Sequence, residues 1–220
     1  MLIFDELACA YNGKVVFSNL SATVPEGNSV LLTGANGSGK TSLLKIIGGL
    51  QKPYSGVVTW NDYNNVREAV VYGEIDINFI GHDLAIKEEL TVLENITYWA
   101  ELAGQPKYIK YALEYFGLKK YARTPCSELS KGWQKKVALS RLITCGGDMW
   151  LLDEPFSNLD VESRLLVEDL ITNMTASGGI AVVSAHSNIS VDFNYKINIS
   201  DFSNSIPEQI AVEKQEPALV

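Results

Sequence analysis

Gly34-Ala35-Asn36-Gly37-Ser38-Gly39-Lys40-Thr41 is the stretch that decides the fold of this chain. It follows the apolar run 29–33 and leads into a helical pattern over 42–47. Glycines let the backbone curl so that successive N–H groups face an anion, and the N-terminus of the following helix adds partial positive charge. A strand, a glycine-rich loop and a helix in this order predict a phosphate-binding loop.

Two side chains at the end of this loop suit a nucleotide and its metal ion. Lys40 can reach the β- and γ-phosphates, and the hydroxyl of Thr41 can bind Mg²⁺. The residues expected to hold the phosphates are Gly34, Asn36, Gly37, Ser38, Gly39, Lys40, Thr41 and Ser42. The alternative is a glycine-rich turn that happens to precede Lys-Thr, and the flanking strand and helix argue against it.

The composition limits what else the chain can be. Its 220 residues fit one α/β domain with a small inserted subdomain. No apolar run approaches the ~18 residues that a membrane span needs, so we expect another chain to cross any membrane involved. The net charge of -8 argues against a nucleic-acid partner. The start of the chain lacks the positive region of a secretory signal, and Cys9, Cys126 and Cys145 form no C-x-x-C pair.

Alternating patterns predict the order of the elements. Short β-type runs separated by turns over the first thirty residues predict an antiparallel sheet, with further strands at 57–60, 69–72 and 78–81. The pattern then becomes helical over about 83–128, where Thr91 and Glu94 are spaced as a capping box. Buried strands at 149–152 and 180–183 enclose a helix over 161–175. We expect one domain over 1–202 and a flexible polar tail over 203–220.

A pair of acidic residues follows the strand at 149–152. Asp153 can hold Mg²⁺ from the side opposite Thr41, and Glu154 can accept a proton from an attacking water. The alternative is an acidic turn that caps the next helix. Paired with the phosphate loop, the two carboxylates favour hydrolysis over nucleotide binding alone.

With these motifs in place, residues 1–202 resemble the ATP-binding subunit of an ABC transporter. Leu129-Ser-Lys-Gly-Trp133 stands where the family has its Leu-Ser-Gly-Gly-Gln signature, and Ser157-Asn-Leu-Asp160 matches the loop after the catalytic glutamate. Tyr11 matches the aromatic residue that stacks on adenine, and His186 matches the histidine that contacts the γ-phosphate. The resemblance implies a P-loop NTPase (RecA-like) α/β core with an antiparallel β subdomain and an α-helical insert.

The chain departs from the family pattern at two positions. His82 stands at the junction where the family usually has a glutamine that touches Mg²⁺ or the water, and Trp133 replaces the signature glutamine. The stretch around Gly81-His82 resembles the branch of the family that exports haem in cytochrome c biogenesis. We expect His82 to be a candidate contact to the metal ion, and we expect no haem on this chain.

The resemblance also implies partners. Ser130 and Gly132 would act on ATP held by a second ATPase subunit in a head-to-tail dimer, and the dimer would drive an integral membrane subunit, a haem-exporter permease. The implied cofactors are ATP and Mg²⁺, and the implied location is the cytoplasmic side of the bacterial inner membrane. Three alternatives stay open: export of another substrate, an ATP-gated binding module with weak hydrolysis, and an ABC protein of translation or DNA maintenance.

Overall fold

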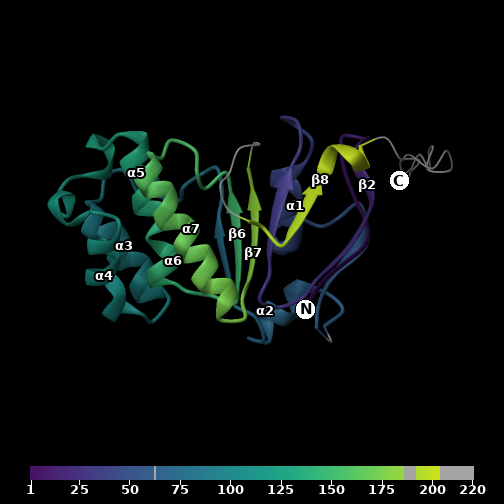
Figure 1. Cartoon of the computed structure of the whole chain (residues 1–220), viewed down its shortest axis with the longest axis horizontal. Helices are drawn as coiled ribbons and strands as arrows, with labels where there is room; N and C mark the ends of the chain where they lie inside the picture. Colours follow the sequence, from purple (N-terminus) through teal and green to yellow (C-terminus); the bar gives the residue numbers. More distant parts are fainter. Residues whose placement is uncertain (62, 186–191, 204–220) are drawn as a thin grey trace, which may run out of the picture.

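The computed structural model describes residues 1–61, 63–185 and 192–203, and it contains two sheets and a helical insert (Figure 1). A three-stranded sheet has the strand order β2-β1-β4, and a five-stranded sheet has the order β5-β6-β7-β3-β8. Pairing is antiparallel in the first sheet and parallel in the second. The predicted α/β class, with its antiparallel β subdomain and helical insert, is confirmed.

The antiparallel sheet begins with a hairpin. β1 (Leu2–Tyr11) and β2 (Lys14–Val24) are joined by Asn12 and Gly13, which both have positive φ as a tight hairpin turn requires. The short β-type runs at 15–17 and 20–24 therefore belong to one strand. β4 (Ser55–Trp60) pairs with the other edge of β1, which confirms the strand predicted at 57–60.

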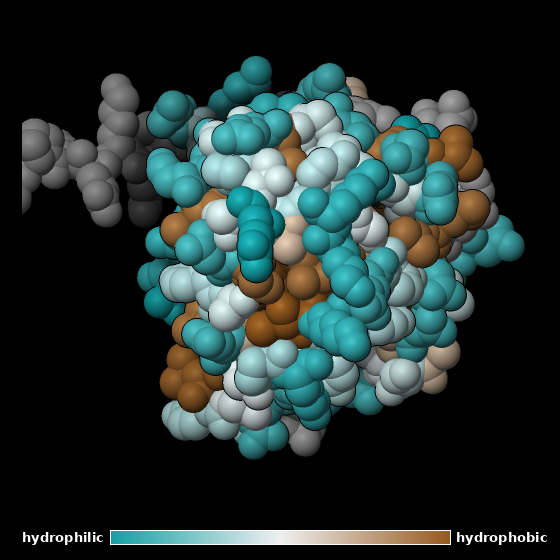
Figure 2. Space-filling view, turned by 90° about the vertical axis from the view of Figure 1, so that its left-hand side faces the viewer, coloured by the Kyte–Doolittle hydropathy of each residue, from teal (hydrophilic) through white to brown (hydrophobic). Residues whose placement is uncertain are grey.

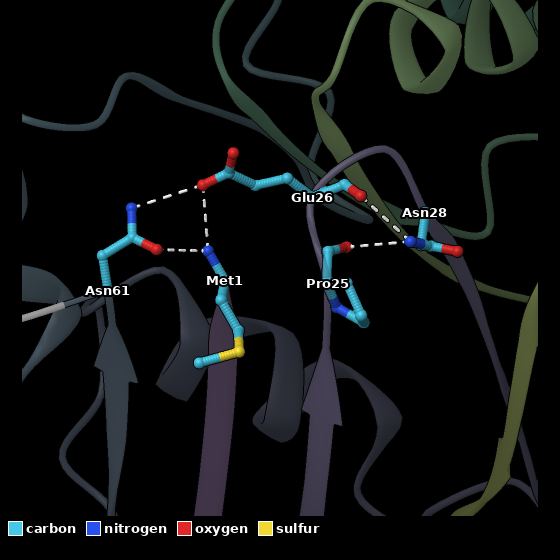
Figure 3. Close-up of polar contacts among 5 residues, drawn as sticks. All are labelled: Met1, Pro25, Glu26, Asn28 and Asn61. Carbon is cyan, nitrogen blue, oxygen red and sulfur yellow. Dashed lines mark hydrogen bonds and ion pairs between the residues drawn. The ribbon is translucent and has the colours of Figure 1, made fainter.

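A polar cluster fixes the turn that leads out of this sheet (Figure 3). The amino group of Met1 lies 3.0 Å from Glu26 Oε1 and also donates to Asn61 Oδ1. Hydrogen bonds to Glu26 from this amino group and from Asn61 Nδ2 lower the pKa of Glu26. Asn28 donates to the carbonyl of Glu26 at 3.0 Å. The turn at 25–27 is thereby held where β3 begins.

The parallel sheet is covered on both faces. Every residue of β6 (Met149–Asp153) and β7 (Ile180–Ser184) is buried, as the continuous apolar runs predict. Because successive side chains point to opposite faces, Leu151 packs with one apolar cluster and Leu152 with the other. In Figure 1, α1 (Lys40–Ile47) and α7 (Val161–Ala176) lie on either side of these strands. The remaining strands of the sheet are β3 (Ser29–Thr33), β5 (Ile77–Ile80) and β8 (Tyr195–Asn198).

The strand predicted at 69–72 is wrong, because this segment lies in a helix, α2 (Val66–Val71). Asn65 caps it, and its side chain accepts a hydrogen bond from the backbone N–H of Glu68 at 2.8 Å. Val66 and Ala69 are buried, whereas Val71 is exposed, which is the three-residue spacing of a helix face. The β-branched pair at 70–71 favoured a strand, and the cap outweighs it.

The insert is helical, as predicted. Thr91 and Glu94 form the predicted capping box at the start of α3 (Val92–Leu102). The insert also holds α4 (Ile109–Tyr115) and short 3₁₀ turns at Pro106–Tyr108, Lys119–Tyr121 and Cys126–Glu128. The helices α5 (Lys131–Leu139) and α6 (Arg141–Thr144) follow the predicted insert and pack beside it. A last 3₁₀ turn, η4 (Ile199–Phe202), follows β8. The predicted tail is described only at Ser203, so 204–220 lie outside the described residues.

Candidate functional site

The loop between β3 and α1 has the backbone that its glycines allow. Gly34 and Gly39 have φ values of 141° and 106°, in the region that favours glycine. A Cβ atom on Gly39 would lie 2.9 Å from side-chain atoms of Val16 and Phe17, and one on Gly34 would lie 2.6 Å from Ser38 Oγ. The tight curl predicted for residues 34–39 is therefore present, and it requires glycine at both ends.

Polar groups of the loop suit an anionic ligand. Lys40 is buried, and its Nζ donates to the carbonyls of Gly34 and Ala35 at 2.8 and 3.0 Å, so the ammonium group spans the loop. The buried hydroxyl of Ser38 makes no hydrogen bond to any residue that the structure describes. No side chain caps α1, and its first turn holds no acidic residue. An uncapped helix N-terminus, a buried cation and an unpaired hydroxyl together fit a phosphate group.

The predicted metal side of the site is assembled from distant parts of the chain. Thr41 Oγ1 donates to Asp153 Oδ2 at 2.7 Å, and Ser184 Oγ donates to Asp153 Oδ1 at 2.5 Å. Asp153 is buried at the end of β6, next to β7. Carboxylate and hydroxyl oxygens are the donors that Mg²⁺ prefers, so Thr41 and Asp153 fit the ion. Within the described ranges, no group of three or more His, Cys, Asp or Glu gathers as a metal site.

Glu154 is held in an uncommon backbone conformation beside Asp153. Its φ is 49°, and its N–H donates to the carbonyl and the hydroxyl of Ser184 at 3.1 and 3.0 Å. Ser157 Oγ donates to the Glu154 carbonyl at 2.9 Å. Residues in sparsely populated conformations persist only where the surroundings fix them, and they cluster at functional sites. Sequence reasoning missed Ser184, because a serine that ends a buried strand carries no motif.

Tyr11 borders a second part of the same site. It is about half exposed, and its hydroxyl donates to Gln51 Oε1 at 2.6 Å and lies 3.4 Å from Ser42 Oγ. A hollow of about 420 Å³ extends from Tyr11 along loop residues 35–38 to Ser200. Ser200 Oγ accepts a hydrogen bond from the N–H of Ala35 at 3.2 Å. Sequence reasoning missed this serine too, since no local pattern marks a contact across 165 residues.

The signature segment begins α5. Ser130 caps the helix by accepting from the N–H of Trp133 at 3.4 Å. A Cβ atom on Gly132 would lie 2.7 Å from the carbonyl oxygen of Asn158, which explains the glycine there. Trp133 packs on the insert, with the ring of Tyr121 at 4.6 Å and the ammonium of Lys136 at 4.2 Å.

The structure separates the signature from the phosphate loop within one chain. In Figure 1, α5 lies among the insert helices at the left, whereas α1 lies on the other side of β6 and β7. Ser130 and Gly132 therefore need a second subunit if they are to meet a nucleotide. His82 is exposed and borders a different hollow, so its metal role stays a prediction, and His186 lies outside the described residues.

Comparison with known proteins identifies the family. Residues 17–157 match the ABC transporter family. The chain belongs to this family. A protein of Rickettsia bellii named cytochrome c biogenesis ATP-binding export protein CcmA is 40% identical over 186 residues, which cover 84% of this chain and 93% of the relative. A protein of the same name from Paramagnetospirillum magneticum is 35% identical over 204 residues, which cover 90% of this chain and 93% of the relative.

Solved structures agree with this assignment. An ATP-binding protein from Pyrococcus furiosus, described as an ABC transporter, superposes with a TM-score of 0.78 and 26% identity, covering 92% of this chain and 98% of that one. A dimeric ATP-binding cassette bound to ADP and Pi has the same fold, with a TM-score of 0.73 and 24% identity, covering 85% and 88%. The fold inferred for this ABC protein therefore holds over nearly its whole length.

Proposed function

We propose that this chain is the ATP-hydrolysing subunit of an ABC transporter that exports haem, or releases it to a haem-binding protein, in cytochrome c biogenesis. The observation that carries the proposal is the similarity to CcmA proteins over most of both chains. The loop geometry, with a buried lysine across it and Thr41 bonded to Asp153, supports a nucleotide site.

In this proposal the chain binds ATP through the loop. The N–H groups of residues 34–42 and the ammonium of Lys40 take the phosphates, and Tyr11 stacks on the adenine. Thr41 and Asp153 hold Mg²⁺, which when bound neutralises charge on the β- and γ-phosphates. Burial of Asp153 and its two hydroxyl donors keep its carboxylate in a fixed orientation.

Hydrolysis then depends on Glu154. A water attacks the γ-phosphorus, its proton passes to the Glu154 carboxylate, and the bond from the γ-phosphorus to the bridging oxygen breaks, leaving ADP and phosphate. The backbone of Glu154 is fixed by Ser184 on one side and Ser157 on the other, so the carboxylate starts from a defined position. His186 orients the γ-phosphate in this proposal.

We propose that two ATPase subunits act head to tail. Ser130 and Gly132 begin α5 on the far side of the sheet from the loop, so a partner subunit must bring its own loop to them (Figure 1). The N-terminus of α5 would then add partial positive charge at the partner's γ-phosphate.

We also propose an integral membrane partner, a haem-exporter permease, which would place this chain at the cytoplasmic side of the bacterial inner membrane. No helix in the described part of the chain is long and apolar enough to cross a bilayer. Figure 2 faces the insert end of the molecule and shows hydrophobic side chains ringed by hydrophilic ones. On the insert helix α3, Leu93 and Leu102 are 39% and 69% exposed. Half-buried Leu84 and Ile86 line the hollow that His82 borders, and they are the proposed contacts with the membrane subunit.

Deletion of the gene tests the proposal. We expect c-type cytochromes to disappear from haem-stained membranes, while b-type cytochromes stay, because only c-type maturation needs this transporter in our proposal. The wild-type gene should restore the c-type bands, and a gene encoding Glu154→Gln should not. Normal c-type staining with a defect in some other export would contradict the haem assignment and leave the ATPase proposal standing.

His82 and Trp133 lead to a prediction about rate. Both stand where the family usually has glutamine, so the isolated subunit should hydrolyse ATP slowly and depend on its partner. We expect the double variant His82→Gln, Trp133→Gln to raise the basal rate about fivefold, which is about 1 kcal/mol of barrier. Phosphate release with and without the membrane partner measures this, and the two single variants are the controls. If the parent and the double variant have the same basal rate and the same partner-stimulated rate, His82 and Trp133 have only a structural role.

A further inference from the structure

Lys135 is a buried lysine that the proposed mechanism does not use. It lies on α5, five residues after Ser130, and its exposed fraction is 4%. It forms no hydrogen bond or ion pair with any residue that the structure describes. Its neighbours on the helix differ: Lys131 lies 3.9 Å from Glu88, and Lys136 lies 3.5 Å from Asp160. Lysine is almost never fully buried without a partner, so this position needs an explanation.

A polar hollow connects Lys135 to the catalytic turn. Its volume is about 300 Å³, and three segments line it: residues 82–88 at the start of the insert, residues 131–135 of α5, and residues 157–158 after β6. Ser157, in its wall, donates to the carbonyl of Glu154 at 2.9 Å. The hollow therefore joins the signature helix to the turn that carries the proposed base.

Burial and nearby carboxylates have opposite effects on the charged form of Lys135. Burial lowers the pKa of Lys135, whereas the carboxylates of Asp153 and Glu154 act to raise it, so these two acids are the groups that favour its charged form. At the mouth of the hollow, Glu88 is already paired with Lys131. These two acids are the proposed metal ligand and the proposed base, and Lys135 lines the hollow that reaches their turn.

We propose that Lys135 is a positioning residue that ties the signature helix to Asp153 and Glu154 of the same chain. The inference rests on the proposed ATPase function. The first residues of α5, Ser130 and Gly132, face the nucleotide held by the partner subunit, and Lys135 lies little more than one turn further along the same helix. A shift of α5 when the partner's ATP arrives therefore moves a cation relative to the base of the chain's own site.

The experiment uses the full chain with its membrane partner and compares Lys135→Met with Lys135→Arg. We expect Lys135→Met to lower kcat about tenfold, an effect well above assay error, while the dissociation constant for ATP changes less than about twofold. Its thermal midpoint should hold or rise, because an apolar side chain of similar length replaces a buried charge. Lys135→Arg keeps the charge and should retain most of the rate.

Lys110→Met is the matched control, since Lys110 is exposed on α4, and it should leave kcat and thermal midpoint unchanged. A hydrolysing wild type with equal kcat in Lys135→Met overturns this inference alone, whereas a wild type without ATPase activity overturns the proposed function. A rate loss that follows a fall in thermal midpoint assigns Lys135 to packing and also overturns the inference. If Lys135→Met fails to fold, Lys135→Arg alone decides. A Lys135→Arg variant that folds but has a tenfold lower kcat overturns the inference, because the charge is kept and the rate is lost.

Discussion

Glu154→Gln is expected to lower the rate of ATP hydrolysis roughly 10²–10⁴-fold, the range that a general base contributes. Glutamine is nearly isosteric with glutamate but cannot accept the water's proton. The backbone bonds that hold residue 154, from its N–H to Ser184 and from Ser157 to its carbonyl, do not involve the side chain and should survive. ATP should therefore stay bound, and the dimer should accumulate in its closed form.

Phosphate release measures the rate, and size-exclusion chromatography with ATP measures the trapped dimer. Glu162→Gln is the matched control, because Glu162 is exposed in the first turn of α7, a few residues beyond the catalytic turn. It should hydrolyse ATP at the parent rate. Phosphate release from Glu154→Gln at the wild-type rate would remove Glu154 from its proposed role.

Sequence patterns predicted those parts of the site that a short stretch of chain forms by itself. The glycine spacing at 34–39 dictates the loop because only glycine accepts the φ values found at Gly34 and Gly39. Thr91 and Glu94 close a capping box over three residues, and Ser130 caps α5 in the same local way. The continuous apolar runs of β6 and β7 likewise indicate strands buried on both faces.

Sequence patterns did not predict the contacts between segments that lie far apart in the chain. Ser184 reaches Asp153 across 31 residues, and Ser200 reaches the N–H of Ala35 across 165. A serine carries no signal of such a partner, because its side chain is common in every kind of segment. No sequence pattern marked Lys135, because only the packing of α5 shows that it is buried. The error at 69–72 is different, since the cap at Asn65 was a local signal in the sequence, and the strand prediction gave more weight to Val70 and Val71.

Lys40→Ala should abolish tight ATP binding, which separates binding from the chemistry that Glu154→Gln tests. The ammonium spans the loop through the carbonyls of Gly34 and Ala35, and it is the buried cation nearest the place proposed for the phosphates. Hydrogen bonds to charged groups contribute about 1.5–3 kcal/mol each, so losing one or two predicts an affinity weaker by roughly 10- to 10⁴-fold.

Titration with a fluorescent ATP analogue measures this affinity, and Lys45→Ala is the matched control. Lys45 lies in the last turn of the same helix, α1, and is exposed, so its removal takes away the same charge and stem without touching the loop. If both variants bind ATP as the parent does, the loop is not the phosphate site. If both weaken binding equally, the net charge of α1 matters and not the position of Lys40. If only Lys40→Ala binds ATP weakly and its thermal midpoint is unchanged, the ammonium of Lys40 is assigned to the phosphates. A binding loss caused by destabilising the loop, through the two lost carbonyl contacts, would lower the thermal midpoint.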